Sequence, residues 1–167
     1  LNSLTKWVQD QFDTRLNWDD VKRIKDWWGG KLIIKGIMDP DDAKMAQKCG
    51  ADALVVSNHG GRQLDGVNSS ISTLPEIKKA VSNMEVLMDG GISSGQDILK
   101  AIAMGAEGVM IGRSFVYGLS AGGKEGVTKS LEILNKELDM TMALCGRRDI
   151  KNVGRDIIKD CPFFEKN

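Results

Sequence analysis

A histidine and an arginine stand close together in a glycine-rich segment, and the pair could act on an acid substrate. His59 is the only histidine of the chain, and it lies in the run SNHGGRQ at residues 57–63. A positioned imidazole can serve as a general base, which typically contributes about 10²–10⁴-fold in rate. The planar guanidinium of Arg62 can hold a carboxylate through two hydrogen bonds. The pair predicts chemistry on an acid, and the alternative for a single histidine is a structural hydrogen bond within its loop.

A lysine follows the first apolar run of the chain. In parallel α/β folds, polar residues at the carboxyl ends of strands face the binding crevice. Lys35 comes directly after the apolar residues 32–34 and is followed by Gly36. If a flavin lies across the strand ends, a buried ammonium at this position would stabilise its anionic reduced ring. The alternative is a lysine that only reaches solvent.

Two glycine turns follow the third and fourth apolar runs. The first reads Asp89-Gly90-Gly91 and the second Gly112-Arg113, and a helix is expected to start after each. Backbone N–H groups in such turns, together with a helix dipole, can hold a phosphate. Arg113 would add a fixed positive charge. The alternative is a pair of ordinary turns between strand and helix.

Four short apolar runs predict the strands that would carry these residues. They are rich in β-branched residues, and a helical pattern follows each of them. Repeated βα units with right-handed crossovers form a parallel sheet, which can be open or closed as a barrel. Four such units are half of an eight-unit barrel. The predicted strands cover residues 32–34, 53–56, 86–88 and 109–111.

Capping residues predict where the helices begin and end. The first helix after a strand has Asp39 as its N-cap, Pro40 at its first position and a stop at Gly50. A later start at Ser94 is supported by Asp97 in a capping-box-like arrangement. The helix that starts at Ser94 is expected to stop at Gly105, and another helix is expected after Pro75. Two further helices are expected, one from Trp18 to Trp28 and one from about Ser114 to Leu138 with a break around Gly122 and Gly123.

The bulk composition excludes several classes of protein. A length of 167 residues with 41% hydrophobic residues fits a single domain covering residues 1–167. The 23 basic and 23 acidic residues cancel, which leaves no electrostatic footprint for nucleic acid. Three separate cysteines without a Cys-x-x-Cys pair argue against a disulfide framework and a metal site, and favour a cytoplasmic setting. Because the chain begins with Leu1 rather than Met, we expect either a fragment or a truncated gene product.

The run at residues 57–63, continued by LDG at residues 64–66, resembles the active-site signature of the FMN-dependent 2-hydroxy-acid dehydrogenases and oxidases. The resemblance covers nearly the whole chain, and the segments 16–30, 124–126 and 140–144 look closest to the mandelate dehydrogenase branch. It implies a TIM (β/α)₈ barrel, of which this chain covers about four C-terminal βα units, and FMN as cofactor. The implied reaction oxidises an (S)-2-hydroxy acid of the mandelate, lactate or glycolate type to the 2-keto acid.

The resemblance also implies roles for single residues. His59 would be the base acting at C2 of the substrate, and Arg62 would clamp its carboxylate. Lys35 would lie beside flavin N1 and O2, and Ser57 would touch the flavin ring, against which His59 and Arg62 would also lie. Whether hydrogen leaves C2 as a proton or a hydride stays open. The positions implied at the ribityl chain and phosphate are Asp89, Gly90, Gly91, Ser93, Gly112 and Arg113.

Two departures from the family pattern affect what the chain can do. Ser93 stands where the family typically has arginine, and losing a hydrogen bond to a charged group, about 1.5–3 kcal/mol, would weaken FMN binding by roughly one to two orders of magnitude. The first half of the barrel, which supplies substrate-binding tyrosines, a second arginine and an aspartate that orients the histidine, is absent. Exposed strand edges and apolar faces then predict a homo-oligomer or a separate N-terminal half.

Two other functions stay open. A catalytically inactive half-barrel would retain only the phosphate- and flavin-binding turns. Another phosphate barrel, such as inosine-monophosphate dehydrogenase or type 2 isopentenyl-diphosphate isomerase, has similar glycine turns but needs no base beside a carboxylate clamp. For the favoured function the electron acceptor would be a quinone, a cytochrome or O₂. The expected location is cytoplasmic, or peripheral to the inner membrane through a segment outside this chain.

Overall fold

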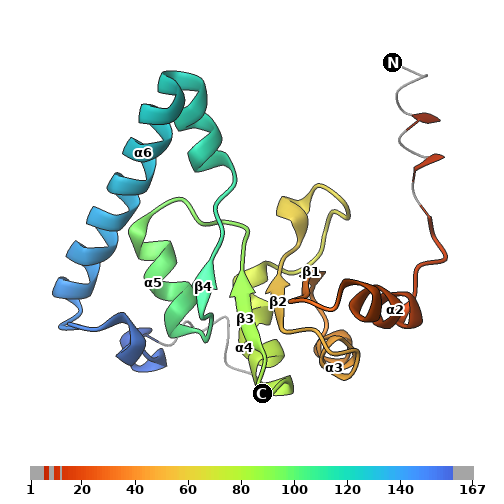
Figure 1. The fold of residues 1–167 in the computed structure, drawn as a ribbon. Helices are drawn as coiled ribbons and strands as arrows, with labels where there is room; N and C mark the ends of the chain where they lie inside the picture. The colour runs from red at the N-terminus through yellow and green to blue at the C-terminus, as the bar shows by residue number, and fades with distance from the viewer. Residues whose placement is uncertain (1–5, 8–9, 12, 160–167) are drawn as a thin grey trace.

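The computed structural model describes residues 6–7, 10–11 and 13–159, and a parallel sheet lies at its centre (Figure 1). The four strands follow the order β1-β2-β3-β4, and every neighbouring pair is parallel. The α/β class is confirmed, and sequential βα units fit part of a (β/α)₈ barrel. The strands are β1 (Ile33–Ile37), β2 (Ala53–Val56), β3 (Glu85–Met88) and β4 (Gly108–Val109). The helices are α2 (Trp18–Trp28), α3 (Pro40–Lys48), α4 (Ser70–Ala80), α5 (Gly95–Ala103) and α6 (Arg113–Leu144), with short 3₁₀ turns η1 (His59–Gly61), η2 (Ile150–Asn152) and η3 (Arg155–Ile157).

The predicted capping residues begin α3 and α5. The side chain of Asp39 accepts a hydrogen bond from the backbone N–H of Asp41 over 2.7 Å, and Pro40 is the first helical residue. Ser94 accepts from the N–H of Asp97 over 3.2 Å at the start of α5. Each cap satisfies an N–H group that has no partner within the helix. The starts at Pro40 and near Ser94 are therefore confirmed.

Helix α4 begins before the position that the sequence suggests. Ser69 is its N-cap, and Pro75, which was expected to precede the helix, lies inside it. Proline lacks the N–H that would bond the preceding turn, so its position inside a helix is unfavourable by itself. Leu74 and Ile77 on either side of it have no exposed surface, and burying such side chains stabilises the helix by about 1.5–3 kcal/mol each. Tertiary packing therefore outweighs the local signal.

Strand β1 is longer than predicted because it contains a bulge. The prediction ended the strand at residue 34, but Lys35 and Gly36 lie within it. Lys35 pairs with Val55 and Ile37 with Val56, so Gly36 is an extra residue opposite the continuous strand β2. Successive residues of a strand point to opposite faces, so the bulge places Lys35 and Ile37 on opposite faces of the sheet.

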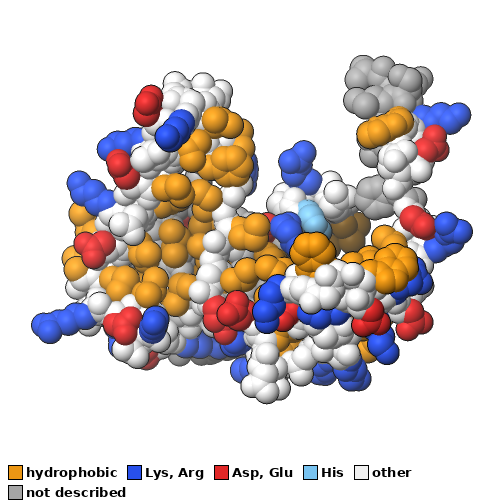
Figure 2. Space-filling view, in the orientation of Figure 1, with side chains coloured by type: hydrophobic (Ala, Val, Ile, Leu, Met, Phe, Trp, Pro, Cys, Tyr) orange, Lys and Arg blue, Asp and Glu red, His pale blue; other side chains and the backbone are white. Residues whose placement is uncertain are grey.

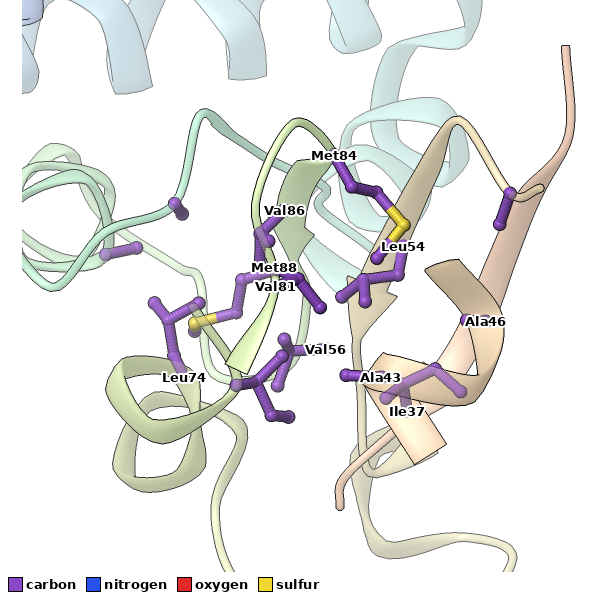
Figure 3. Packing of buried hydrophobic residues seen from close by; sticks show 14 of the residues in the cluster. Ile37, Ala43, Ala46, Leu54, Val56, Leu74, Val81, Met84, Val86 and Met88 are labelled. Atoms are coloured by element: carbon purple, nitrogen blue, oxygen red, sulfur yellow. The ribbon is translucent and has the colours of Figure 1, made fainter. Parts of the chain in front are cut away.

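One hydrophobic core joins the sheet to the helices that follow its strands (Figure 3). Alternate residues of β2, Leu54 and Val56, belong to this core, and both are fully buried. Because helices α3, α4 and α5 contribute to the same cluster, they cover the same face of the sheet, as in a barrel wall. Further members of the cluster are Ile37, Ala43, Ala46, Leu74, Ile77, Val86, Met88 and Ala101.

Helix α6 is a hairpin of two helical arms that follows β4 (Figure 1). Gly122 and Gly123 have non-helical backbone angles, which confirms the predicted break. The two arms touch at Gly118 and Gly126, where a Cβ on Gly126 would overlap the carbonyl oxygen of Gly118. Although α6 spans 32 residues, no helix in the described ranges is long and apolar enough to cross a membrane.

Replacing Gly126 with alanine is expected to lower the free energy of unfolding by about 1–3 kcal/mol, because the methyl group forces the arms of α6 apart. Gly122→Ala is the matched control, since an ideal Cβ there meets no atom within 4 Å and the φ angle of −153° lies outside the left-handed region. Urea denaturation of both variants measures the difference. Equal losses in the two variants would contradict the close contact between the arms.

Candidate functional site

Three of the predicted site residues meet at the carboxyl ends of β1, β2 and β3. Lys35 Nζ donates a hydrogen bond to Ser57 Oγ over 3.1 Å. The same nitrogen lies 3.1 Å from Asp89 Oδ2. The Ser57 side chain is buried, whereas Lys35 and Asp89 keep 37% and 21% of their side-chain surface exposed. The lysine is therefore a fixed, half-buried cation between two strands and does not simply reach solvent.

His59 joins this cluster through the same serine. Its backbone N–H donates to Ser57 Oγ over 3.1 Å, and its φ angle of +54° is in the left-handed region. His59 begins the 3₁₀ turn η1, and Figure 2 shows the imidazole at the surface, in pale blue. Ser57 Oγ thus accepts hydrogen bonds from the Lys35 ammonium and from the backbone N–H of His59, so one hydroxyl joins the lysine to the start of the histidine turn.

Two residues that the sequence reasoning missed hold the turn in place. Asn58 Oδ1 accepts from the backbone N–H of Gly60 over 2.9 Å, and the Asn58 N–H donates to Ser70 Oγ over 3.2 Å. An asparagine directly before a glycine-rich turn is a signal for such a local hydrogen bond. Arg62 ends the turn and its side chain is exposed, so His59 and Arg62 both extend from one braced loop.

A carboxylate oxygen at the site has no partner among the described residues. Asp89 Oδ1 is buried and accepts no hydrogen bond within residues 13–159, whereas Oδ2 of the same group pairs with Lys35. A buried acceptor without a donor is unfavourable by about 1–3 kcal/mol. A hydroxyl group of a ligand could supply this donor. Gly90 and Gly91 follow with φ angles of +88° and +78°, and a Cβ on Gly91 would meet no atom within 4 Å, so the backbone there is open to a ligand.

The amino terminus of α5 already has acceptors for its N–H groups. Asp97 Oδ2 accepts from the backbone N–H of Ser93 over 3.1 Å and from the hydroxyls of Ser93 and Ser94. Glu137, from α6, accepts from the N–H of Gly95 over 2.9 Å. Burial raises the pKa of Asp97, but the hydrogen bonds from Ser94 and Ser93 outweigh this effect and hold its pKa below the usual value. Two carboxylates therefore occupy the position where a phosphate would bind α5.

The amino terminus of α6 differs from that of α5. Its N-cap is Gly112, which provides no side-chain hydrogen bond, and an ideal Cβ at this position meets no atom within 4 Å. The first helical residue, Arg113, is exposed. Free N–H groups at a helix start and an adjacent guanidinium together favour an anion. Of the two predicted phosphate turns, the one at Gly112 and Arg113 is open to a ligand.

The site is open to solvent in the described part of the chain. Two surface hollows, of about 680 and 330 Å³, lie instead along α5, α6 and residues 148–159, and none of the predicted site residues lines them. Within residues 13–159 and the shorter described segments, no group of three His, Cys, Asp or Glu side chains could hold a metal ion. The charged and titratable side chains of the predicted site are those of Lys35, His59, Arg62, Asp89 and Arg113.

Comparison with known proteins shows several close similarities. A family model described as FMN-dependent dehydrogenase matches residues 1–160. The chain is 48% identical over 161 residues to an L-lactate dehydrogenase of Caulobacter vibrioides (strain NA1000 / CB15N), covering 96% of this chain and 42% of that protein. It is 50% identical over 151 residues to an L-lactate dehydrogenase of Allorhizobium ampelinum, covering 90% of this chain and 40% of that protein.

The chain is also similar to solved structures of mandelate oxidase. A crystal structure of mandelate oxidase with (S)-4-hydroxymandelic acid has a TM-score of 0.80 and 42% identity, covering 84% of this chain and 40% of that chain. A mandelate oxidase mutant with the monooxide FMN adduct has a TM-score of 0.81 at 42% identity, covering 84% of this chain and 45% of that chain. The chain thus spans less than half the length of the relatives that it matches.

Proposed function

The chain belongs to the FMN-dependent dehydrogenase family, and from this premise we propose that it is the carboxyl-terminal half-barrel of an enzyme that oxidises an (S)-2-hydroxy acid to the 2-keto acid. The single observation that carries the proposal is the contact of Lys35 and His59 with one buried hydroxyl, that of Ser57. This contact joins the lysine to the backbone of the histidine turn, and it supports a site for the proposed base and cation at the carboxyl ends of parallel strands, where α/β enzymes bind their ligands. Relatives named L-lactate dehydrogenase and mandelate oxidase act on acids of this class.

The residues at the strand ends fit FMN. The unpartnered Asp89 Oδ1 can accept a hydrogen bond from a ribityl hydroxyl, and the open backbone at Gly91 lets a ligand approach. The uncapped start of α6 at Gly112, together with Arg113, suits a phosphate. Lys35 is placed to stabilise negative charge on a ring that lies across the strand ends. We propose that these residues, with Ser57 and Gly90, form the chain's share of the FMN site.

In the proposed reaction each residue has a separate task. Arg62 holds the substrate carboxylate, so that C2 lies within reach of His59. His59 accepts a proton from the substrate as the hydroxy acid becomes a keto acid. Bound FMN supplies the acceptor for the two electrons. Lys35 offsets the negative charge that accumulates nearby, while a quinone, a cytochrome or O₂ would reoxidise the enzyme.

Replacing Arg62 with lysine is expected to raise KM for the 2-hydroxy acid by about 10–100-fold, because one charge remains but the paired hydrogen bonds to the carboxylate are lost. Steady-state reduction of a dye with a series of 2-hydroxy acids measures the effect. A methyl ester of the same acid is the matched control substrate, since it lacks the carboxylate charge and should discriminate less between the two proteins. An unchanged KM for the acid would remove Arg62 from substrate binding.

A second candidate function is an inactive half-barrel that retains only flavin- or phosphate-binding turns. It is favoured by the contacts at α5, where the Ser93 hydroxyl pairs with Asp97 in place of a phosphate. Titrating FMN with the chain while following flavin fluorescence tests the flavin site itself. Saturable quenching at one FMN per chain together with turnover of a 2-hydroxy acid supports the proposed function. Quenching without turnover would leave the inactive half-barrel as the better account.

We also propose that the open edges of the sheet are covered by another part of the protein or by a second copy of the chain. Strands β1 and β4 are its outer strands, and apolar side chains are exposed on them and on the hairpin of α6 (Figure 2). Unpaired edges and apolar patches of this kind favour association. Either further βα units or a second copy of the chain would cover them, and analytical ultracentrifugation separates the two, since only the second gives a dimer. Exposed examples are Ile33, Met110, Phe115, Tyr117 and Ile133.

A further inference from the structure

The bulge residue of β1 lies against the imidazole of His59. An ideal Cβ on Gly36 would be 2.6 Å from Cε1 of His59, 3.4 Å from Nε2 and 3.7 Å from Nδ1. The shortest of these separations is well inside van der Waals contact between carbon atoms. A side chain at position 36 and the ring in its present place therefore exclude one another, although Gly36 lies in β1 and His59 in the turn η1 that follows β2.

The backbone of His59 is held independently of its ring. Its N–H donates to Ser57 Oγ, and its left-handed φ angle of +54° fixes the direction in which the side chain leaves the turn. A left-handed residue other than glycine is uncommon and is held by its surroundings. The backbone contacts thus set the start of the side chain, and the bare α-carbon of Gly36 borders the space in which the ring rests.

Position 36 requires glycine for two separate reasons. Its φ angle of +99° is a conformation that L side chains rarely adopt, as expected for the extra residue of a bulge. The overlap with His59 is a second reason, and it disappears when the imidazole is removed. A residue kept as glycine only for its backbone angle would not respond to the identity of residue 59.

We propose that Gly36 is a positioning residue for His59. Because Gly36 has no side chain, it leaves the space in which the imidazole rests against the bulge of β1. The expected effect of Gly36 on turnover rests on the proposed function, in which His59 is the base. The expected effect of Gly36 on the structure does not rest on that function, since the contact between Gly36 and His59 involves only residues of this chain.

The test is a double-mutant cycle on the full chain, measured as thermal unfolding without ligand. Gly36→Ala should lower the melting temperature about twice as much with His59 present as in the His59→Ala background, because contacting residues are energetically coupled. Gly66→Ala is the matched control, with a φ angle of +76° and no atom within 4 Å of an ideal Cβ. Its loss should be the same in both backgrounds. If Gly36→Ala fails to fold, the double variant should recover the fold.

A second readout follows the ring itself. Because His59 is the only histidine, its ε1 proton gives one resolved signal in a ¹H–¹³C correlation spectrum. Gly36→Ala should shift this signal, whereas Gly66→Ala should leave it in place. Equal melting losses in both backgrounds, a double variant that stays unfolded, or an unmoved ε1 signal would each overturn the role of Gly36. None of these outcomes depends on whether the chain binds FMN or turns over a hydroxy acid.

Discussion

Replacing His59 with alanine is expected to lower the turnover of a 2-hydroxy acid by about 10²–10⁴-fold, because the reaction loses its general base. FMN should remain bound, since the groups proposed to hold its phosphate and ribityl chain, Asp89 and Arg113, are untouched. Stopped-flow reduction of the bound flavin measures the rate of the chemical step. Flavin fluorescence and thermal unfolding of the same variant show whether the site stays assembled.

The matched control is Lys48→Ala, an exposed residue at the end of α3, which should turn over at the rate of the unmodified protein. A His59→Gln variant adds a second comparison, because it retains a polar side chain of similar reach without a basic nitrogen. Loss of turnover in both His59 variants with flavin bound supports the role of base. Retained turnover in either variant would show that another group accepts the proton.

Replacing Arg113 with alanine is expected to raise the dissociation constant of FMN by about 10–100-fold, because a hydrogen bond between charged groups is lost at the phosphate. Ser93→Ala should change the constant far less, since Asp97 already binds the Ser93 hydroxyl and backbone N–H. The contrast follows from the two helix starts, of which α5 is capped by carboxylates and α6 has no side-chain cap.

Riboflavin provides the ligand control for Arg113, because it keeps the ring and ribityl chain but lacks the phosphate. Fluorescence titrations with both flavins should show that Arg113→Ala weakens FMN and leaves riboflavin nearly unchanged. If Arg113→Ala weakened the binding of FMN and of riboflavin equally, Arg113 would contact the flavin ring or support the fold, and would not bind the phosphate. A larger effect of Ser93→Ala than of Arg113→Ala would move the phosphate to α5.

Local signals predict most of the elements. The starts of α3 and α5 follow from Asp39 with Pro40 and from Ser94, because side-chain caps act within a few residues. The break in α6 follows from Gly122 and Gly123. Strand β2 follows from an apolar run that is buried on both faces, and β3 follows from an apolar run in which Val86 and Met88 are buried. These features depend on neighbours in the chain, which a sequence displays directly.

Features that depend on distant contacts are not predictable in this way. The start of α4 before Pro75 rests on burial of Leu74 and Ile77 against the sheet, which local propensity does not reveal. The bulge at Gly36 depends on pairing with β2. Glu137 reaches the N–H of Gly95 across 42 positions of sequence, so nothing near α5 indicates that this second carboxylate lies at its amino terminus.

The candidate site shows the same division. Residue types at the strand ends predict a base, a cation and glycine turns, and the structure brings Lys35, Ser57 and His59 into contact. The sequence does not reveal that one serine hydroxyl joins the lysine and the histidine, or that Asp89 presents an oxygen without a partner among the described residues. Both depend on the register of neighbouring parallel strands, which places residues 22 positions apart within one hydrogen bond.

The most direct test of the central claim is anaerobic mixing of the FMN-loaded protein with (S)-mandelate or (S)-lactate while the visible absorbance of the flavin is recorded. Bleaching with an (S)-2-hydroxy acid and release of the 2-keto acid in equal amount is the expected result, and the (R)-enantiomer should bleach far more slowly. Bound FMN that keeps its full absorbance with every 2-hydroxy acid would contradict the proposed oxidation.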